Sequence, residues 1–280
     1  MKEIIREFFG FGELGYTRLA EGYMSWQHLT FVTVLMIIMT GLAVYFGQKY
    51  KNSEEKQKNK VLIWAALLID GFELLKIVIH CIASKDAMAW VDQLPLFLCS
   101  IQLITIPLAA FTKGRIKEAS LDFVSIFGLL GAVLGTYLAG NNYSVYPVIS
   151  FPNVVSGITH SISGFAALYI IISGMTSMKR KNIPITYAII TSFSVAAYIA
   201  DVIGEYNYMF LMRGDGTPYD IIFNLVNGNP VIYPISVVVL FYLYIIAFHF
   251  AFNYIKDLKR GEKNKNCEAE VVEAHEEITV

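Results

Sequence analysis

The sequence predicts an all-α, polytopic membrane protein with a bundle of seven membrane-spanning helices. Hydrophobic residues make up 55% of the chain and charged residues only 16%, against roughly 25% charged in ordinary soluble domains. The charged residues are concentrated between seven apolar runs, each about long enough for a helix to cross the hydrocarbon core of a bilayer. The net charge of −1 and the lack of nucleic-acid-binding motifs indicate that the chain has no nucleic-acid partner.

The elements are expected in a simple linear order. The first 28 residues combine charged side chains with apolar ones such as Ile4, Ile5 and Phe8, which predicts a short extracytoplasmic helix on the membrane surface and no cleaved signal peptide. A seven-helix membrane domain takes residues 29–254. Residues 255–280 are polar and acidic, which predicts a disordered cytoplasmic tail. The expected spans are 29–46, 61–82, 94–111, 121–138, 154–174, 185–203 and 231–252.

Lysine and arginine residues in the connections set the orientation. Sixteen of the 22 lie in alternate loops and in the tail, and only five lie in the remaining connections. Because positively charged loops stay in the cytoplasm, we expect an extracytoplasmic N-terminus and a cytoplasmic C-terminus in a multi-pass protein of the cell membrane.

The second predicted span carries a polar face. Asp70, Glu73, Lys76 and His80 fall within an arc of about 120° on a helix, and charges in a bilayer are costly, so this face must turn inward. His28 lies just before the first span and is expected at a depth similar to that of His80. The face is either a structural ion pair between Glu73 and Lys76 or the wall of a functional polar cavity.

Two reactive side chains are expected at one depth. The third span enters from outside with Cys99 five residues after its start, and the fifth span also enters from outside with His160 six residues after its start. At 1.5 Å per residue both lie about 8–9 Å deep. A thiol and an imidazole so placed are the parts of a nucleophile–base pair. The alternatives are a cysteine buried as a small apolar residue and a histidine that hydrogen-bonds between helices.

Other site chemistry is not indicated. The three cysteines follow no metal-binding or disulfide spacing, so no metal and no cofactor is expected. The loop 204–230 mixes aromatic residues with turn signals and is expected to fold back over the outer mouth of the bundle. Asn207, Tyr208 and Arg213 are its candidate binding residues.

Three short strings carry a resemblance to a known family. They are Trp-Gln-His-Leu at 26–29, Leu-Pro-Leu-Phe-Leu-Cys at 94–99 and Asn-Tyr-Met-Phe-Leu at 207–211, and together with His160 they resemble the YwaF-like bacterial integral membrane proteins. Animal relatives of that family look like a transmembrane family that includes a cysteine-dependent phospholipid acyltransferase. Phe97 stands where many relatives are expected to carry a histidine.

The resemblance implies an enzyme that moves fatty acyl groups between membrane lipids, or hydrolyses them, with Cys99 and His160 matching the catalytic pair of the family. The expected partners are then a membrane phospholipid and a lysolipid. Two other functions stay open. One is a proton- or ion-coupled transporter that uses Asp70, Glu73 and Lys76, and the other is a seven-helix sensor or assembly factor. The sequence identifies neither an oxyanion stabiliser nor an oligomeric state.

Overall fold

The protein is all-α in its computed structural model, which describes residues 2–12 and 15–278. Within these residues the only β-type pairing is an isolated bridge between Gly12 and Gly15. Five helices in the described part of the chain are long and apolar enough to cross a membrane. The all-α, multi-span prediction is therefore confirmed, whereas the count of seven spans is not. The five candidates are Trp26–Tyr50, Gly114–Val145, Phe151–Ile172, Arg180–Gly204 and Ile232–Leu258.

The two remaining predicted spans differ from the five in charge and in length. Helix α3 (Glu55–Ser84) has 30 residues, but the charged residues Asp70, Glu73 and Lys76 interrupt its apolar stretch. Helix α4 (Gln102–Phe111) has only 10 residues, about 15 Å of helix, which is roughly half of the hydrocarbon thickness.

The predicted helix at 94–111 is wrong in its first half. Leu94 has an extended backbone (φ −58°, ψ 140°) because the ring of Pro95 disfavours the helical conformation of the preceding residue. The chain then turns, with the Ser100 N–H donating to the Phe97 carbonyl at 2.9 Å. Cys99 therefore lies in a turn before α4 and not on the second turn of a helix, so its depth cannot be counted along one.

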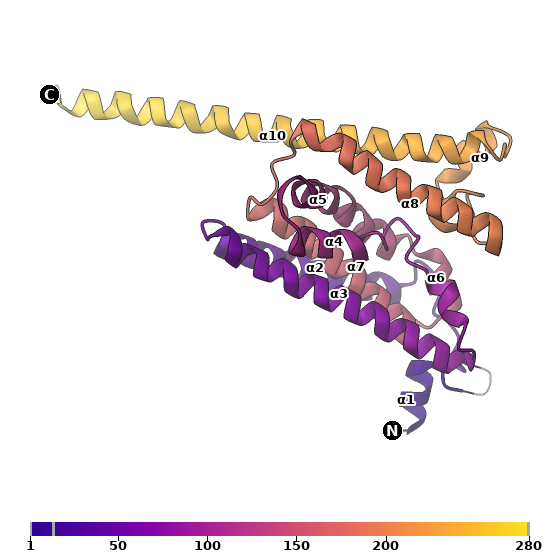
Figure 1. The fold of residues 1–280 in the computed structure, drawn as a ribbon. Coiled ribbons are helices and arrows are strands. Elements are labelled where there is room, and N and C mark those ends of the chain that lie inside the picture. The colour runs from indigo at the N-terminus through magenta and orange to yellow at the C-terminus, as the bar shows by residue number, and fades with distance from the viewer. Residues whose placement is uncertain (1, 13–14, 279–280) are drawn as a thin grey trace.

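Helices α5 (Gly114–Tyr137) and α7 (Phe151–Ile172) form the centre of the bundle. Helices α2 (Trp26–Tyr50), α3 and α4 pack around this pair, and α8 (Ile183–Gly204) and α10 (Ile232–Ile278) lie together on the other side of α5, with the short α9 (Tyr219–Leu225) beside α10 (Figure 1). The outward faces expose large apolar side chains such as Ile37, Leu74 and Ile203, as expected of surfaces that contact lipid.

Small residues let α5 and α7 approach closely. A Cβ atom at Gly128 would lie 2.9 Å from the Ser163 carbonyl oxygen, and one at Gly164 would lie 2.6 Å from the Ala132 Cβ. Side chains at these positions would push the helices apart.

The two ends of the chain extend beyond the bundle. Helix α1 (Lys2–Phe9) packs Phe9 against Phe151 with ring centroids 5.0 Å apart and leaves Ile4 exposed, so its position on the membrane surface stays a prediction. At the other end α10 continues as helix to Ile278, across the segment for which the sequence predicts disorder. The Glu, Lys and Ala residues there favour helix. Disorder of the tail also stays a prediction.

Candidate active site

The fold brings Cys99 and His160 together. Cys99 comes from the turn before α4 and His160 from the middle of α7, and the two side chains lie close enough for each to affect the charge of the other. The geometry is looser than a standard hydrogen bond, because His160 Nε2 has no partner of standard geometry among the described residues. Such looseness is common in catalytic pairs before substrate binds.

The backbone of α7 sets the protonation pattern of His160. Its Nδ1 atom lies 2.7 Å from the carbonyl oxygen of Ser156, one helical turn earlier. A carbonyl only accepts hydrogen bonds, so Nδ1 carries the proton in the neutral ring. The lone pair is then on Nε2, the nitrogen that lacks a standard partner. His160 therefore presents a base to the thiol of Cys99.

Two glycines of α5 make room for this pair. A Cβ atom at Gly131 would lie 3.6 Å from the Cys99 Cβ, and one at Gly135 would lie 2.2 Å from the His160 Nε2 and Cδ2 atoms. The glycines are one helical turn apart and so share a face of α5. The imidazole thus occupies the space that a side chain at position 135 would fill.

The polar face of α3 borders the pair on one side. Lys76 Nζ lies 2.6 Å from Glu73 Oε1, so the predicted ion pair forms, and Lys76 is close enough to exert a Coulombic effect on both Cys99 and His160. Asp70 lies one turn before Glu73 on α3, and its Oδ1 is buried without a partner in the described residues.

A cavity of ≈ 290 Å³ opens beside this face. It combines the two carboxylates of α3 with Pro95 and Leu103 on either side of the Cys99 turn, and Cys99 itself is not among the lining residues. His80 and Lys76 are not among its walls. The lining residues are Asp70, Glu73, Leu74, Ile77, Gln93, Pro95 and Leu103.

His28 has a different environment from the one expected. It is fully buried, its Nε2 lies 3.0 Å from the Thr136 carbonyl oxygen and its Nδ1 accepts from the Met24 N–H at 3.2 Å. The Nε2 contact joins the start of α2 to the end of α5, and the Nδ1 contact holds the turn just before α2. His28 does not line the cavity beside α3.

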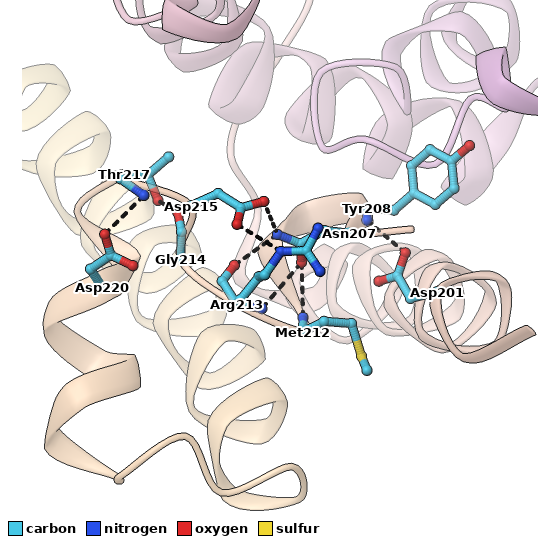
Figure 2. A network of polar contacts seen from close by, with 10 residues as sticks. Asp201, Asn207, Tyr208, Met212, Arg213, Gly214, Asp215, Thr217 and Asp220 are labelled. Atoms are coloured by element: carbon cyan, nitrogen blue, oxygen red, sulfur yellow. Dashed lines mark hydrogen bonds and ion pairs between the residues drawn. The ribbon is translucent and has the colours of Figure 1, made fainter. Parts of the chain in front are cut away.

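The loop residues Asn207 and Arg213 belong to a network inside their own loop (Figure 2). The Asn207 amide donates to Asp215 Oδ2 at 2.7 Å, and its Oδ1 accepts from the Met212 N–H at 3.0 Å. Arg213 Nε donates to Asp215 Oδ1 at 2.7 Å. These contacts order the loop, and a binding role for it stays a prediction.

Tyr208 links this loop to the turn that carries Cys99. Its N–H donates to Asp201 at 2.6 Å (Figure 2), its hydroxyl donates to the Val91 carbonyl at 3.3 Å, and its ring packs edge-on against Phe97 at 5.0 Å. Tyr208 is only 2% exposed. The strings at 94–99 and 207–211 therefore contact each other, and the second supports the turn formed by the first.

Comparison with known proteins gives one match. The model of the TMEM164 family matches residues 23–247, a range that contains Cys99, His160, the α3 polar face and Tyr208. No curated protein and no solved structure is similar to the chain. The YwaF-like name is not the one that the match carries, but the match agrees with the expected relationship to a transmembrane family. The chain belongs to the TMEM164 family.

Proposed function

We propose that this protein is a membrane-embedded lipid acyltransferase in which Cys99 is the nucleophile and His160 the general base. The observation that carries the proposal is the tautomer of His160. The Ser156 carbonyl holds the proton on Nδ1, and Nε2 is left as a base beside the thiol. This is the arrangement that activates a cysteine for attack on an ester.

In the first step the Cys99 proton passes to His160 Nε2, and the thiolate sulfur attacks the ester carbonyl carbon of a phospholipid. The carbonyl π electrons move to oxygen and give a tetrahedral oxyanion. When this intermediate collapses, the C–O bond of the ester breaks, and the departing alkoxide takes the proton from the His160 imidazolium. A lysolipid leaves, and the acyl group stays on sulfur as a thioester.

In the second step a lysolipid hydroxyl attacks the thioester. Its proton passes to His160 Nε2, a new C–O bond forms and the C–S bond breaks. The Cys99 thiolate then recovers its proton from the imidazolium. Water in place of the lysolipid would give hydrolysis, so the balance between transfer and hydrolysis depends on how well the site excludes water.

The proposal includes the seven-span topology. A polar face such as that of α3 can span a membrane when it turns inward, and α4 with the turn before it would form a further, broken span beside α3. With the N-terminus outside the cytoplasm, Cys99 lies in the outer half of the bilayer, near the depth of lipid ester groups. The distribution of Lys and Arg supports this orientation.

Acyl exchange in vesicles tests the proposal. The purified protein is reconstituted with a phospholipid that carries a labelled acyl chain and with an unlabelled lysolipid. We expect the label to move to the lysolipid with wild type and not with Cys99→Ala. Equal transfer by the two proteins would reject the mechanism, and release of free fatty acid alone would indicate a hydrolase.

The cavity beside α3 favours a second candidate, a proton- or ion-coupled transporter. Asp70 and Glu73 line it, and the Asp70 Oδ1 has no partner in the described residues, as expected of a group that exchanges a cation. In that case Asp70→Asn would abolish uptake into reconstituted vesicles and Cys99→Ala would leave it unchanged. The acyltransferase instead predicts that Cys99→Ala abolishes acyl exchange and that Asp70→Asn affects it less.

A further inference from the structure

Acyl transfer through Cys99 needs a group that the pair itself does not supply. The tetrahedral intermediate carries a full negative charge on oxygen, and enzymes stabilise it with hydrogen-bond donors that are already in place before attack. The imidazole of His160 holds the proton taken from Cys99, so it does not serve as this donor. A further donor close to Cys99 is therefore required.

Gln102 has such a donor. Its side chain is completely buried, yet its Nε2 has no hydrogen-bond partner among the described residues. Its Oε1 lies 3.1 Å from the Thr105 hydroxyl, which also lies 3.2 Å from the Ile101 carbonyl oxygen, and the NH₂ group is the end without a partner. Buried polar groups without partners are uncommon and call for an explanation.

The backbone places Gln102 next to the nucleophile. It is the first residue of α4, and its N–H donates to the carbonyl of Cys99 at 3.3 Å. This is a three-residue step of the 3₁₀ type, in which side chains three positions apart lie on the same face. In the part of the chain that the structure describes, the N–H of Cys99 itself also donates to no backbone acceptor.

Resting on the proposed function, we propose that Gln102 is the oxyanion-stabilising residue of this site. Its side-chain NH₂ donates to the carbonyl oxygen of the acyl group as the Cys99 sulfur attacks, and the Cys99 N–H is the second donor. The substrate thereby satisfies the unpartnered amide, which explains why a buried glutamine is held here by Thr105.

The test compares two reactions of Cys99 that differ in whether they form an oxyanion. p-Nitrophenyl butyrate acylates a thiol through a tetrahedral intermediate, whereas iodoacetamide alkylates it by direct displacement. Both rates are measured on the reconstituted full chain by mass spectrometry of the Cys99 peptide. The peptide with the free thiol of Cys81 serves as an internal reference.

We expect Gln102→Met, which keeps the size of the side chain and removes the donor, to slow acylation of Cys99 by about 10²–10³-fold and to leave alkylation unchanged. Gln102→Leu, which also removes the donor, should be equally slow and serves if the Met variant does not fold. Equal slowing of both reactions, or of neither, would overturn the role of Gln102.

The same assay separates this inference from the proposed function. If wild-type Cys99 reacts with the ester and Gln102→Met reacts equally fast, only the oxyanion role fails. If wild-type Cys99 is alkylated but is not acylated faster than Cys81, the acyltransferase fails and the role of Gln102 fails with it.

Discussion

Helix α5 passes two buried polar clusters that differ in what surrounds their histidines. One, the thiol cluster, consists of Cys99 and His160 and lies beside Gly131 and Gly135. The other, the carboxylate cluster, consists of Asp122, Thr176, Asn182 and His249. Positions 122 and 135 are about 20 Å apart along the helix.

The carboxylate cluster is arranged to hold the bundle together. Asp122 accepts from the Thr176 hydroxyl and from the Asn182 amide at 2.8 Å, so both of its oxygens are engaged. His249 interacts with it by charge. These residues come from α5, the segment after α7, the start of α8 and α10. The hydrogen bonds of Asp122 therefore tie α5 to the start of α8 and to the segment after α7.

The thiol cluster also contains an imidazole, which is partly buried, but its neighbour is different. His249 also lacks standard hydrogen-bond partners among the described residues, so an unpartnered ring is not by itself a sign of catalysis. His160 differs because Ser156 fixes its tautomer, a thiol lies against it and a cavity opens beside the Cys99 turn. Local chemistry, and not burial, separates the two sites.

The largest effect is expected from replacing His160, with the replacement of His249 for comparison. His160→Gln removes the base, so formation of the Cys99 thioester should fall by about 10³-fold or more. His249→Gln is the matched control and should leave the rate per folded molecule unchanged. Thioester formation is followed with a labelled phospholipid in vesicles. A comparable loss in both variants would remove the distinction between the clusters.

The two glycines of α5 give the next largest effect. Gly135→Ala places a Cβ atom 2.2 Å from the imidazole, so the ring must move, and a displacement of this size should slow acyl transfer by about 10²-fold. Gly131→Ala brings a Cβ atom only to 3.6 Å from Cys99, an ordinary contact, and should be tolerated. The acyl-exchange assay compares the two, and equal rates would show that the imidazole has room to relocate.

A third prediction concerns the carboxylate cluster. Asp122→Ala leaves the donors of Thr176 and Asn182 buried without an acceptor, which costs about 1–3 kcal/mol for each donor. Thermal unfolding in detergent should therefore start at a lower temperature, with an unchanged acylation rate below it. Ser120→Ala on the same helix is the control, because the Ser120 hydroxyl has no partner in the described residues to lose. A loss of rate without a loss of stability would contradict the structural role.

The smallest effect is expected at the N-terminal segment, near the start of α7. Hydrogen bonds from the Arg18 N–H, the Thr17 hydroxyl and the Thr17 N–H hold the pKa of Glu7 below its ordinary value of 4.5. Because the folded pKa is the lower one, this contact stabilises the fold above pH 4.5 and is lost as pH falls through the folded pKa. Hydrogen exchange of the Thr17 and Arg18 amides, corrected for intrinsic rates, should speed up there. In Glu7→Gln the exchange of these amides should be fast at every pH. If the pH response persists in this variant, it is caused by another group.

The sequence predicts part of this site and not the rest. Hydropathy and the Lys and Arg pattern predict only that Cys99 and His160 lie at a similar depth, and for Cys99 that count assumed a helix at 94–99 that does not form. The start of α4 was predicted eight residues too early, since the apolar run at 94–111 does not reveal that the chain turns after Pro95. The contact between Phe97 and Tyr208 joins residues far apart in sequence, and no local pattern encodes it.

The finer features of the site depend on three-dimensional packing. From the sequence, a glycine in an apolar span is interpreted as a site of close helix packing. Only the structure shows that Gly135 faces an imidazole. The missing partner of the Gln102 amide likewise depends on what surrounds it. The contact between the Ser156 carbonyl and His160 Nδ1 was not predicted from the sequence.

The most direct test of the central claim is to trap the acyl-enzyme. The reconstituted protein is mixed with a phospholipid whose acyl chain carries an alkyne tag, quenched in acid and mapped by mass spectrometry. The account predicts the tagged acyl group on Cys99, its release by neutral hydroxylamine and its transfer to added lysolipid. Formation of tagged product lipid by a protein whose Cys99 never carries the tag, or by Cys99→Ala at the wild-type rate, would contradict it.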